Sequence, residues 1–364
     1  MEQIRDKNLY YVGGYVRDEI LDVECFDIDF CYEGDAIDFT QKFDIIKTNK
    51  DFGTVRILLN NKEIDIASTR TEVYPKAGHL PVIKETACSL EKDLQRRDFT
   101  INAIAKNTVT NELVDYFDGL EDIKNKKLRV LHSKSFVDDP TRIVRGLKFS
   151  VRFNFELEEE TKRLQEEYLD NINYDMSYHR LKKELVETFN LNIEDAYNKF
   201  VEQGIYKLLG ENQIIPEIKC SIQDLIDKFN PQYRWLVYLG LYDLSNFELN
   251  REESAILNSY HKIKSIKPKD NVETYFLFNK APLESVLLYA ISINFDIVIN
   301  YLDNLRNLKP FVNGDDLLAL GVPKGVAYKD ILEKLLIEKI KNPNMTKVEE
   351  IELVKSQLLN GFLK

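Results

Sequence analysis

The sequence predicts an α+β protein in which a head of mixed strands and helices is followed by an all-helical remainder. Up to about residue 130, segments with the alternating pattern of strands lie between helix-like segments. From Pro140 onward, apolar residues recur at helical spacing nearly to the end of the chain. With 364 residues, 44% hydrophobic and 30% charged, the chain is long enough for two or three packed units of an ordinary globular protein.

The head is expected to contain short strands joined by turns. Residues 53–68 predict a β-hairpin, because apolar residues alternate on both sides of the turn dipeptide Asn60-Asn61. Residues 74–82 contain prolines and a glycine, which predict a loop. Further strands are expected at 9–12, 26–30 and 43–48.

The remainder of the chain is expected to be helical. The periodic segments are 140–153, 159–170, 177–190 and 328–340. The most apolar run, 285–302, contains Asn294, Asp296 and Asn300, so we expect a buried core helix and not a membrane span.

Charge and cysteine content limit the classes of function. A formal charge of −11 argues against general nucleic-acid affinity, so an RNA partner would need a locally basic face. Cys25, Cys31, Cys88 and Cys220 show no CxxC spacing, which disfavours a zinc site and predicts free thiols. The N-terminus lacks the pattern of a signal peptide, so we expect a cytoplasmic protein.

The segment "FDIDF" (26–30) places two carboxylates on one face of a strand. Strand periodicity puts Asp27 and Asp29 on one side and the apolar residues on the other. Such a pair suits a hard divalent ion such as Mg²⁺, which takes oxygen ligands. Taken alone, the same pattern would also fit an exposed strand face.

The preceding segment "VGGYVRDEIL" favours the metal site over the exposed strand face. Gly13-Gly14 ends a strand and leads into a helix expected over 15–21, whose first backbone N–H groups would favour an anion. Arg17, one turn into that helix, could add a bidentate phosphate contact. Together with the aspartates, these residues describe a site for a nucleoside triphosphate and its metal.

A second motif, "DLQRRDFTINAIA" (93–105), places two arginines before an expected helix that starts near Asp98–Thr100. Guanidinium groups in this position could bind phosphate. The same stretch could also be a capped amphipathic helix that buries Phe99, Ile101 and Ile104. Both interpretations can hold together.

A third motif, "SFVDDPTRIVRGLKFSVRF" (135–153), carries a candidate base-reading pair. Asp139 before Pro140 is typical of a helix N-cap, which would by itself explain the aspartate. Asp139 and Arg142 would also be neighbours on a helix, one only accepting and the other only donating hydrogen bonds. Cytosine and adenine present an amino donor beside a ring acceptor, whereas uracil and guanine present the reverse. The pair therefore predicts acceptance of C or A without a nucleic-acid template.

These motifs resemble the signatures of the polymerase-β-like nucleotidyltransferases, and more narrowly those of the bacterial-type (class II) tRNA nucleotidyltransferase and poly(A) polymerase family. The resemblance covers about Tyr10 to Phe189, and 314–325 is similar to the tail of tRNA-type members. It implies a polymerase-β-like head followed by a helical neck, body and tail. We expect a catalytic head at 1–130, a base-selecting neck at 131–195, and a tRNA-binding body and tail at 196–364.

The resemblance also implies roles for individual residues. Asp27 and Asp29 would be the catalytic carboxylates that hold two Mg²⁺ ions. Lys148 stands where an arginine is common, which keeps the charge but loses the planar fork. The expected nucleotide-binding residues are Gly14, Arg17, Arg97, Asp139, Arg142, Arg145 and Lys148.

Three secondary features complete the expected site. Residues 177–189 would form a helix that braces the one after Asp139, with Arg180 and Glu184 as an i,i+4 pair. Asp65 could be a third metal-site acid, although an exposed strand face would also carry it. The basic run 261–270 is either an RNA-backbone contact or a solvated loop.

The implied activity is the transfer of nucleotides from CTP and ATP to the 3′ end of tRNA, adding CCA or part of it. No protein partner and no membrane are expected. A partial CC-adding or A-adding enzyme is the main alternative, because 71–94 and 131–142 are similar to forms in some split-function members. A poly(A) polymerase is less favoured because the chain is acidic, and a non-catalytic nucleotide- or RNA-binding module is a further alternative.

Overall fold

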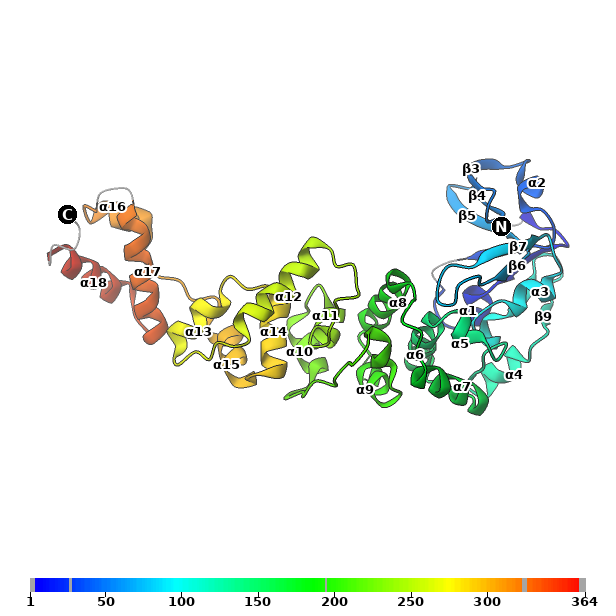
Figure 1. Ribbon diagram of the computed structural model, residues 1–364. Helices are drawn as coiled ribbons and strands as arrows, with labels where there is room; N and C mark the ends of the chain where they lie inside the picture. Colours follow the sequence, from blue (N-terminus) through cyan, green and yellow to red (C-terminus); the bar gives the residue numbers. More distant parts are fainter. Residues whose placement is uncertain (1–3, 26–27, 194, 323–325, 360–364) are drawn as a thin grey trace. The chain divides into compact units, whose positions relative to one another are not determined.

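A computed structural model describes residues 4–25, 28–193, 195–322 and 326–359 (Figure 1). The chain divides into two compact units. Met1–Ile215 and Asp243–Glu248 form the first, and Pro216–Tyr242 and Leu249–Lys364 form the second. The α+β class is confirmed, because strands lie in the first unit and the second consists of helices and connecting segments.

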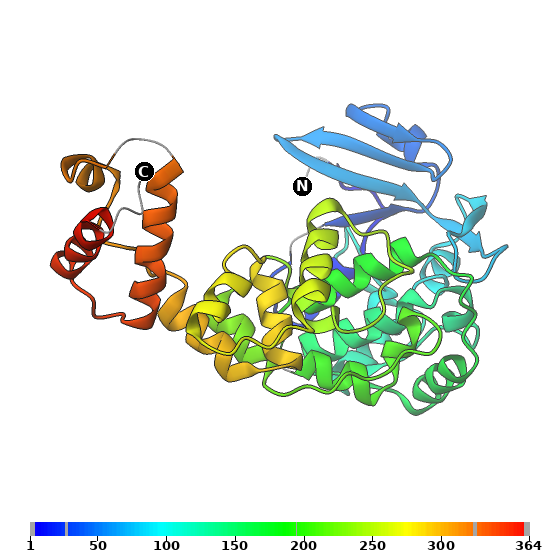
Figure 2. The ribbon, with the colours of Figure 1, turned by 60° about the vertical axis from the view of Figure 1, so that its left-hand side comes forward.

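A seven-stranded mixed sheet forms the centre of the head, in the order β3-β4-β5-β2-β1-β8-β9. The pairing of β2 with β5 is parallel and the other pairings are antiparallel. Figure 2 shows β3, β4 and β5 at one end of the sheet. The strands are β1 (Leu9–Val12), β2 (Asp29–Tyr32), β3 (Asp44–Asn49), β4 (Thr54–Leu59), β5 (Lys62–Ser68), β8 (Ile104–Asn107) and β9 (Leu113–Asp115).

The predicted hairpin is confirmed as β4 and β5. Asn60 and Asn61 form its turn with φ angles of 50° and 61°, the left-handed values that a two-residue type I′ turn requires. The alternation of the two strands buries Val55, Ile57 and Ile66 in one cluster with residues of β1 and β2.

The strand that carries the aspartate pair begins later than predicted. Strand β2 starts at Asp29, and Phe26 and Asp27 lie outside the described residues. Asp29 is exposed while Phe30 is 2% exposed, which is the predicted alternation. Ile28, expected on the apolar face, is 39% exposed because it precedes the strand.

The helix predicted after Asp98 is wrong. The structure has a single 3₁₀ turn at η2 (Thr100–Asn102), followed directly by β8. Phe99, Ile101 and Ile104 are fully buried as expected, but the backbone of 104–107 pairs with β1 and β9. Sheet pairing therefore overrides the helical spacing of these apolar residues.

Short helices and a second hairpin surround the sheet. The β6–β7 hairpin encloses residues 74–81, so the loop predicted at 74–82 ends one residue earlier, where β7 begins. Its strands and those of a small parallel pair are β6 (Arg70–Val73), β7 (Val82–Thr86), β10 (Lys127–Leu128) and β11 (Glu156–Leu157). The helices are α1 (Gly14–Ile20), α2 (Ala36–Thr40), α3 (Leu90–Gln95) and α4 (Gly119–Lys124).

A helical segment follows within the same unit, and in it α6 packs against α8. This contact confirms that the helix after Asp139, within the third motif, is braced by the helix predicted at 177–189. The elements are α5 (Ser135–Asp138), α6 (Thr141–Phe153), α7 (Glu159–Asp170), α8 (Tyr178–Asn190), α9 (Asp195–Glu202) and the 3₁₀ helix η3 (Ile205–Leu209).

Where the structure describes the second unit, its regular elements are all helices. The core helix predicted at 285–302 is instead broken into α14 and α15, because Asn294 accepts the N–H of Ile297 and begins a new helix. No described helix is long and apolar enough to cross a membrane. The helices are α10 (Ile222–Phe229), α11 (Arg234–Leu239), α12 (Arg251–Ile263), α13 (Asn271–Phe278), α14 (Leu283–Ser292), α15 (Phe295–Asn300), the π-helical turn η4 (Tyr301–Leu305), α16 (Gly314–Ala319), α17 (Val326–Lys341) and α18 (Lys347–Leu359).

Candidate active site

A polar cavity of about 480 Å³ in the first unit gathers the predicted site residues. It is lined by residues of the head, by Asp139 and by residues of α6 and α8, and these include both cations and carboxylates. Asp27 lies outside the described residues; the other predicted residues all line this cavity. They are Gly14, Arg17, Asp29, Arg97, Asp139, Arg142, Arg145 and Lys148. We name it the nucleotide cavity.

The glycine pair lets the backbone approach Arg97 closely. Gly13 has φ 68°, and a Cβ atom there would lie 3.0 Å from Nη1 of Arg97. Any larger residue would therefore both strain the backbone and displace this guanidinium. The turn between β1 and α1 thus keeps Arg97 against the cavity wall.

The described residues supply hydrogen-bond partners for only some of the donors of the Arg97 guanidinium. Its Nη2 donates to Oδ2 of Asp93 at 3.1 Å, while its Nε is buried and has no partner among the described residues. Burial alone would raise the pKa of Asp93, but Arg97 and Arg96 hold it below its usual value. The contact with Asp93 therefore fixes the Arg97 guanidinium at the cavity wall, where its charge suits an anion.

Arg17 is more constrained than the sequence suggested. Its Nε and Nη2 donate to Oδ1 of Asp18 at 2.8 and 2.6 Å, and Nη1 donates to Oδ1 of Asn102 at 2.5 Å. The guanidinium also lies 5.0 and 4.8 Å from the ring centroids of Phe149 and Phe153. Burial lowers the pKa of Arg17, and Asp18 opposes this shift. Arg17 thus supplies a fixed charge to the wall.

Asp139 sits at the start of α6 with both carboxylate oxygens engaged. Oδ1 accepts the N–H of Thr141 at 3.2 Å and its hydroxyl at 2.6 Å, which is the capping contact predicted for this aspartate. Oδ2 accepts Nη2 of Arg180 at 2.5 Å, from α8. The predicted pair of Arg180 with Glu184 is therefore wrong, because Glu184 binds α6 instead.

Arg142 is held almost entirely inside the protein, with 4% exposure. Its Nη1 donates to Oγ of Ser135 at 2.6 Å. Its Nη2 donates to the backbone oxygen of Arg96 at 3.0 Å and to the hydroxyl of Tyr74 at 3.4 Å. Asp139 and Arg142 are thus brought to one cavity by separate sets of supports.

Arg145 and Lys148 are bound by carboxylates from two different segments. Arg145 donates to Oδ2 of Asp98 at 2.7 Å and to Oε1 of Glu184 at 3.2 Å. Lys148 donates to Glu184 and Glu187 at 2.7 and 2.8 Å. Asp98 raises the pKa of Arg145. Burial alone would raise the pKa of Asp98, but Arg145 and the Asn102 amide hold it well below its usual range.

Asp98→Asn is expected to lower the free energy of unfolding by about 2 kcal/mol at pH 7, because it leaves Arg145 without its main partner. Because the folded state lowers the pKa of Asp98, its carboxylate stabilises the fold at every pH above the ordinary pKa of about 4. This stabilisation is lost as the pH falls from about 4 toward the lower pKa of the folded state. Urea unfolding of both proteins at pH 7 and pH 3 checks the sign. A difference that grows toward pH 3 would contradict it.

A second cavity of about 450 Å³ adjoins the other side of Asp29. It is lined by Asp29 and Asp65, which are paired in register on the parallel strands β2 and β5. Both oxygens of Asp65 accept from Arg56, at 2.8 Å each. We name it the strand cavity.

The donors in this region suit a hard cation. Asp29 lines both the nucleotide cavity and the strand cavity, and carboxylate oxygens are the ligands that Mg²⁺ prefers. The described residues contain no group of three or more His, Cys, Asp or Glu side chains arranged to hold a metal. Asp29 and its neighbour Asp65 fit a divalent ion in chemistry, and Asp27 is the further expected ligand.

Some residues of the cavity were not predicted as site residues. Asp98, Tyr74 and Arg180 line it and hold predicted residues in place. Asp98 and Arg180 lie within motifs that the sequence singled out, but their partners are distant in the chain. Tyr74 follows a short strand in a loop, and nothing in its local pattern indicates that it contacts Arg142.

Comparisons with known proteins identify a family and several relatives that this chain resembles. Residues 9–129 match the family described as the poly(A) polymerase head domain. An A-adding tRNA nucleotidyltransferase of Aquifex aeolicus is 31% identical over 375 residues, covering 97% of this chain and 43% of that protein. One from Halalkalibacterium halodurans is 28% identical, covering 96% of this chain and 88% of its own length. A CCA-adding enzyme of Staphylococcus aureus is 29% identical over 74% of this chain and 68% of its length. The chain spans less than half of the Aquifex protein.

Solved structures of similar proteins cover nearly the whole chain. A CCA-adding enzyme in complex with ATP is 27% identical, with a TM-score of 0.74 over 96% of this chain and 90% of that one. One with CTP has a TM-score of 0.72 at 27% identity, over 97% and 90% of the two chains. The Thermotoga maritima CCA-adding enzyme complexed with tRNA has a TM-score of 0.69 at 27% identity, over 96% and 91%.

Proposed function

Because this chain belongs to the bacterial-type (class II) tRNA nucleotidyltransferase and poly(A) polymerase family, we propose that it adds CCA, or part of it, to tRNA 3′ ends from CTP and ATP. The observation that carries this proposal is the nucleotide cavity. Within it, a base-reading pair, arginines for phosphate and a catalytic carboxylate line one space of about 480 Å³. No nucleic-acid template is needed when side chains read the base.

In the proposed reaction, the 3′-hydroxyl of the tRNA attacks the α-phosphorus of the nucleotide. A new phosphodiester bond forms, the bond to the β-phosphate oxygen breaks, and pyrophosphate leaves. Arg97 and the backbone at Gly14 bind the triphosphate, with Arg17 and Arg145 adding positive charge. Asp27 and Asp29 would hold Mg²⁺, which lowers the pKa of the attacking hydroxyl and neutralises charge on pyrophosphate.

Base selection is assigned to Asp139 and Arg142. The Asp139 carboxylate accepts the exocyclic amino group that cytosine and adenine share, and the Arg142 guanidinium donates to the adjacent ring nitrogen. The contacts with Arg180 and Thr141 fix one side chain, and those with Ser135 and the Arg96 carbonyl fix the other. Lys148 adds charge at the edge of the site.

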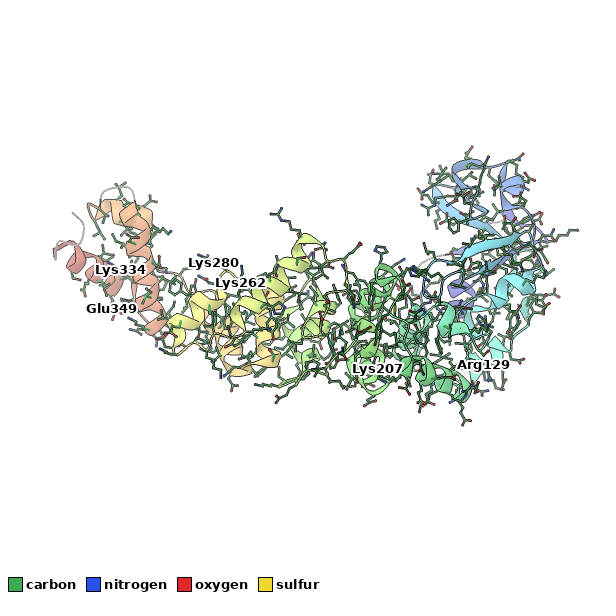
Figure 3. The ribbon with its side chains drawn as sticks, in the orientation of Figure 1. Arg129, Lys207, Lys262, Lys280, Lys334 and Glu349 are labelled. Atoms are coloured by element: carbon green, nitrogen blue, oxygen red, sulfur yellow. The ribbon has the colours of Figure 1, made fainter. Side chains whose placement is uncertain are left out.

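The proposed division of labour follows the chain. Residues 1–130 form the catalytic head, 131–195 form the base-selecting neck, and 196–364 form the body and tail that bind tRNA. Lys262, labelled in Figure 3, and Lys280 are exposed cations of the second unit and suit an RNA backbone. The four cysteines are described without a disulfide bond, which suits a reducing compartment, and the proposed location is the cytoplasm.

An A-adding enzyme is the second candidate. It is favoured by the names of the Aquifex and Halalkalibacterium relatives, both A-adding tRNA nucleotidyltransferases. Such an enzyme would take tRNA ending in CC and use ATP alone. A poly(A) polymerase would share the head, but the acidic chain with net charge −11 makes it less favoured.

One experiment tests these proposals together. The purified protein is incubated with tRNA that lacks C, CC or CCA, with CTP and ATP given separately and together, and the 3′ termini are sequenced. Addition of CCA to the shortest substrate is the expected result. Addition of A only to tRNA ending in CC would support the second candidate. Binding of CTP without any extension would overturn both and leave a nucleotide-binding module.

A further inference from the structure

Tyr74 forms part of a thin wall between the nucleotide cavity and another cavity. This third cavity, of about 520 Å³, is lined by residues of the β6–β7 hairpin, α3 and α5, and we name it the hairpin cavity. The two cavities share a wall made of Glu72, Tyr74, Arg96 and Arg142. One side of Arg142 therefore lines the nucleotide cavity and the other lines the hairpin cavity.

The two salt-bridged members of this wall are more firmly held than Tyr74. Arg96 binds Asp93 at 2.9 Å and Glu72 at 3.0 Å. Tyr74 touches Arg142 through one long hydrogen bond of 3.4 Å and by a cation–π contact of 6.0 Å to the ring centroid. Tyr74 is thus the member of the wall that moves at the lowest cost.

The backbone beyond Tyr74 is anchored, so movement is limited to the side chain. The N–H of Gly78 donates to the carbonyl of Asp138, and the N–H of Ser177 donates to the carbonyl of Gly78, both at 3.0 Å. A Cβ atom on Gly78 would lie 2.8 Å from that of Met176, so the loop sits directly against the helical segment. The loop that follows Tyr74 is therefore held in place by the helical segment.

We propose that Tyr74 is a positioning residue that sets the selectivity between cytosine and adenine by supporting Arg142 and closing the base pocket. This inference rests on the proposed function, because it concerns which of two nucleotides the same cavity takes. Adenine is larger than cytosine by a fused ring. Its binding pushes the Tyr74 ring toward the hairpin cavity, where no packed atoms oppose it. Cytosine leaves the ring where it lies.

Tyr74→Ala and Gln95→Trp are expected to move the selectivity between ATP and CTP in opposite directions, and Tyr74→Phe is expected to have a small effect. Tyr74→Ala removes the wall, so the ratio of kcat/KM for ATP to that for CTP rises about tenfold on the same tRNA. Tyr74→Phe keeps the ring and loses only the long hydrogen bond, so it changes the ratio by about twofold. Gln95→Trp, at an exposed residue that lines only the hairpin cavity, fills the space behind the ring and lowers the ratio.

The assay uses the full chain and tRNA ending in CC or lacking CCA, with CTP and ATP titrated separately. Tyr116→Ala is the matched control, because Tyr116 is 50% exposed and lines neither cavity. The KM for tRNA is expected to stay the same in every variant, and calorimetric Kd values for CTP and ATP follow the same ratio.

The outcomes separate this inference from the proposed function. Suppose the wild type transfers nucleotides and Tyr74→Ala is folded and active, but the ratio of kcat/KM for ATP to that for CTP is the same in both. This result overturns the role of Tyr74 and does not affect the proposed function. A shift of Gln95→Trp in the same direction as Tyr74→Ala also overturns the role of Tyr74. Absence of transfer by the wild type to any tRNA overturns the function, and the inference falls with it.

Discussion

Asp29→Asn is expected to lower kcat for nucleotide transfer by about 10³-fold, or about 4 kcal/mol in the barrier. The substitution keeps the size of the side chain and removes the charge that suits a divalent ion. Asp29 lines both the nucleotide cavity and the strand cavity, so in the proposed reaction its charge would act close to the reacting phosphate. Single-turnover extension of tRNA with CTP measures the effect at saturating Mg²⁺.

Binding measurements separate chemistry from folding in this variant. Arg97, Asp139 and Arg142 are unchanged, so Kd for CTP without Mg²⁺ is expected to change by less than about threefold. Asp44→Asn is the matched control, because Asp44 is an exposed aspartate of β3 in the same sheet and lines neither cavity. Normal extension by Asp29→Asn would show that the metal assignment is wrong.

The local parts of the fold could be predicted, and the parts decided by distant contacts could not. The hairpin at 53–68 has a turn dipeptide and alternating strands within one short segment, so its signal is complete in the sequence. Residues 99–104 carry apolar spacing that fits a helix as well as a buried strand. Pairing of β8 with β1, almost a hundred residues earlier, decides between them.

The same distinction applies to the site. Candidate site residues, such as Arg97 and Asp139, could be proposed from the sequence because their motifs are compact, and the structure brings them to one cavity. Their supports could not, because Arg180 reaches Asp139 across 41 residues and Arg145 reaches Asp98 across 47. An ion pair between side chains that far apart depends on how α6, α8 and the head pack. Sequence spacing predicted a local pair of Arg180 with Glu184, and packing gave each a different partner.

Asp139→Asn is expected to lower the selectivity for CTP over UTP by about 10²-fold, because it replaces a group that only accepts hydrogen bonds with one that can also donate them. The carboxylate only accepts, which suits the amino group of cytosine and opposes the carbonyl of uracil. An amide can turn its NH₂ toward that carbonyl, and Arg180 can still donate to the amide oxygen. The expected result is slower CTP use together with new UTP use, measured as kcat/KM for each nucleotide on one tRNA.

The adjacent aspartate provides the control for this prediction. Asp138 lines the hairpin cavity and not the nucleotide cavity, so Asp138→Asn makes the same chemical change one residue away and should leave the CTP to UTP ratio unchanged. Equal losses for CTP and UTP in Asp139→Asn would mean that Asp139 only caps α6. In that case its contact with Thr141 would explain the whole effect. A gain in UTP use has no such explanation, because a helix cap does not distinguish the two bases.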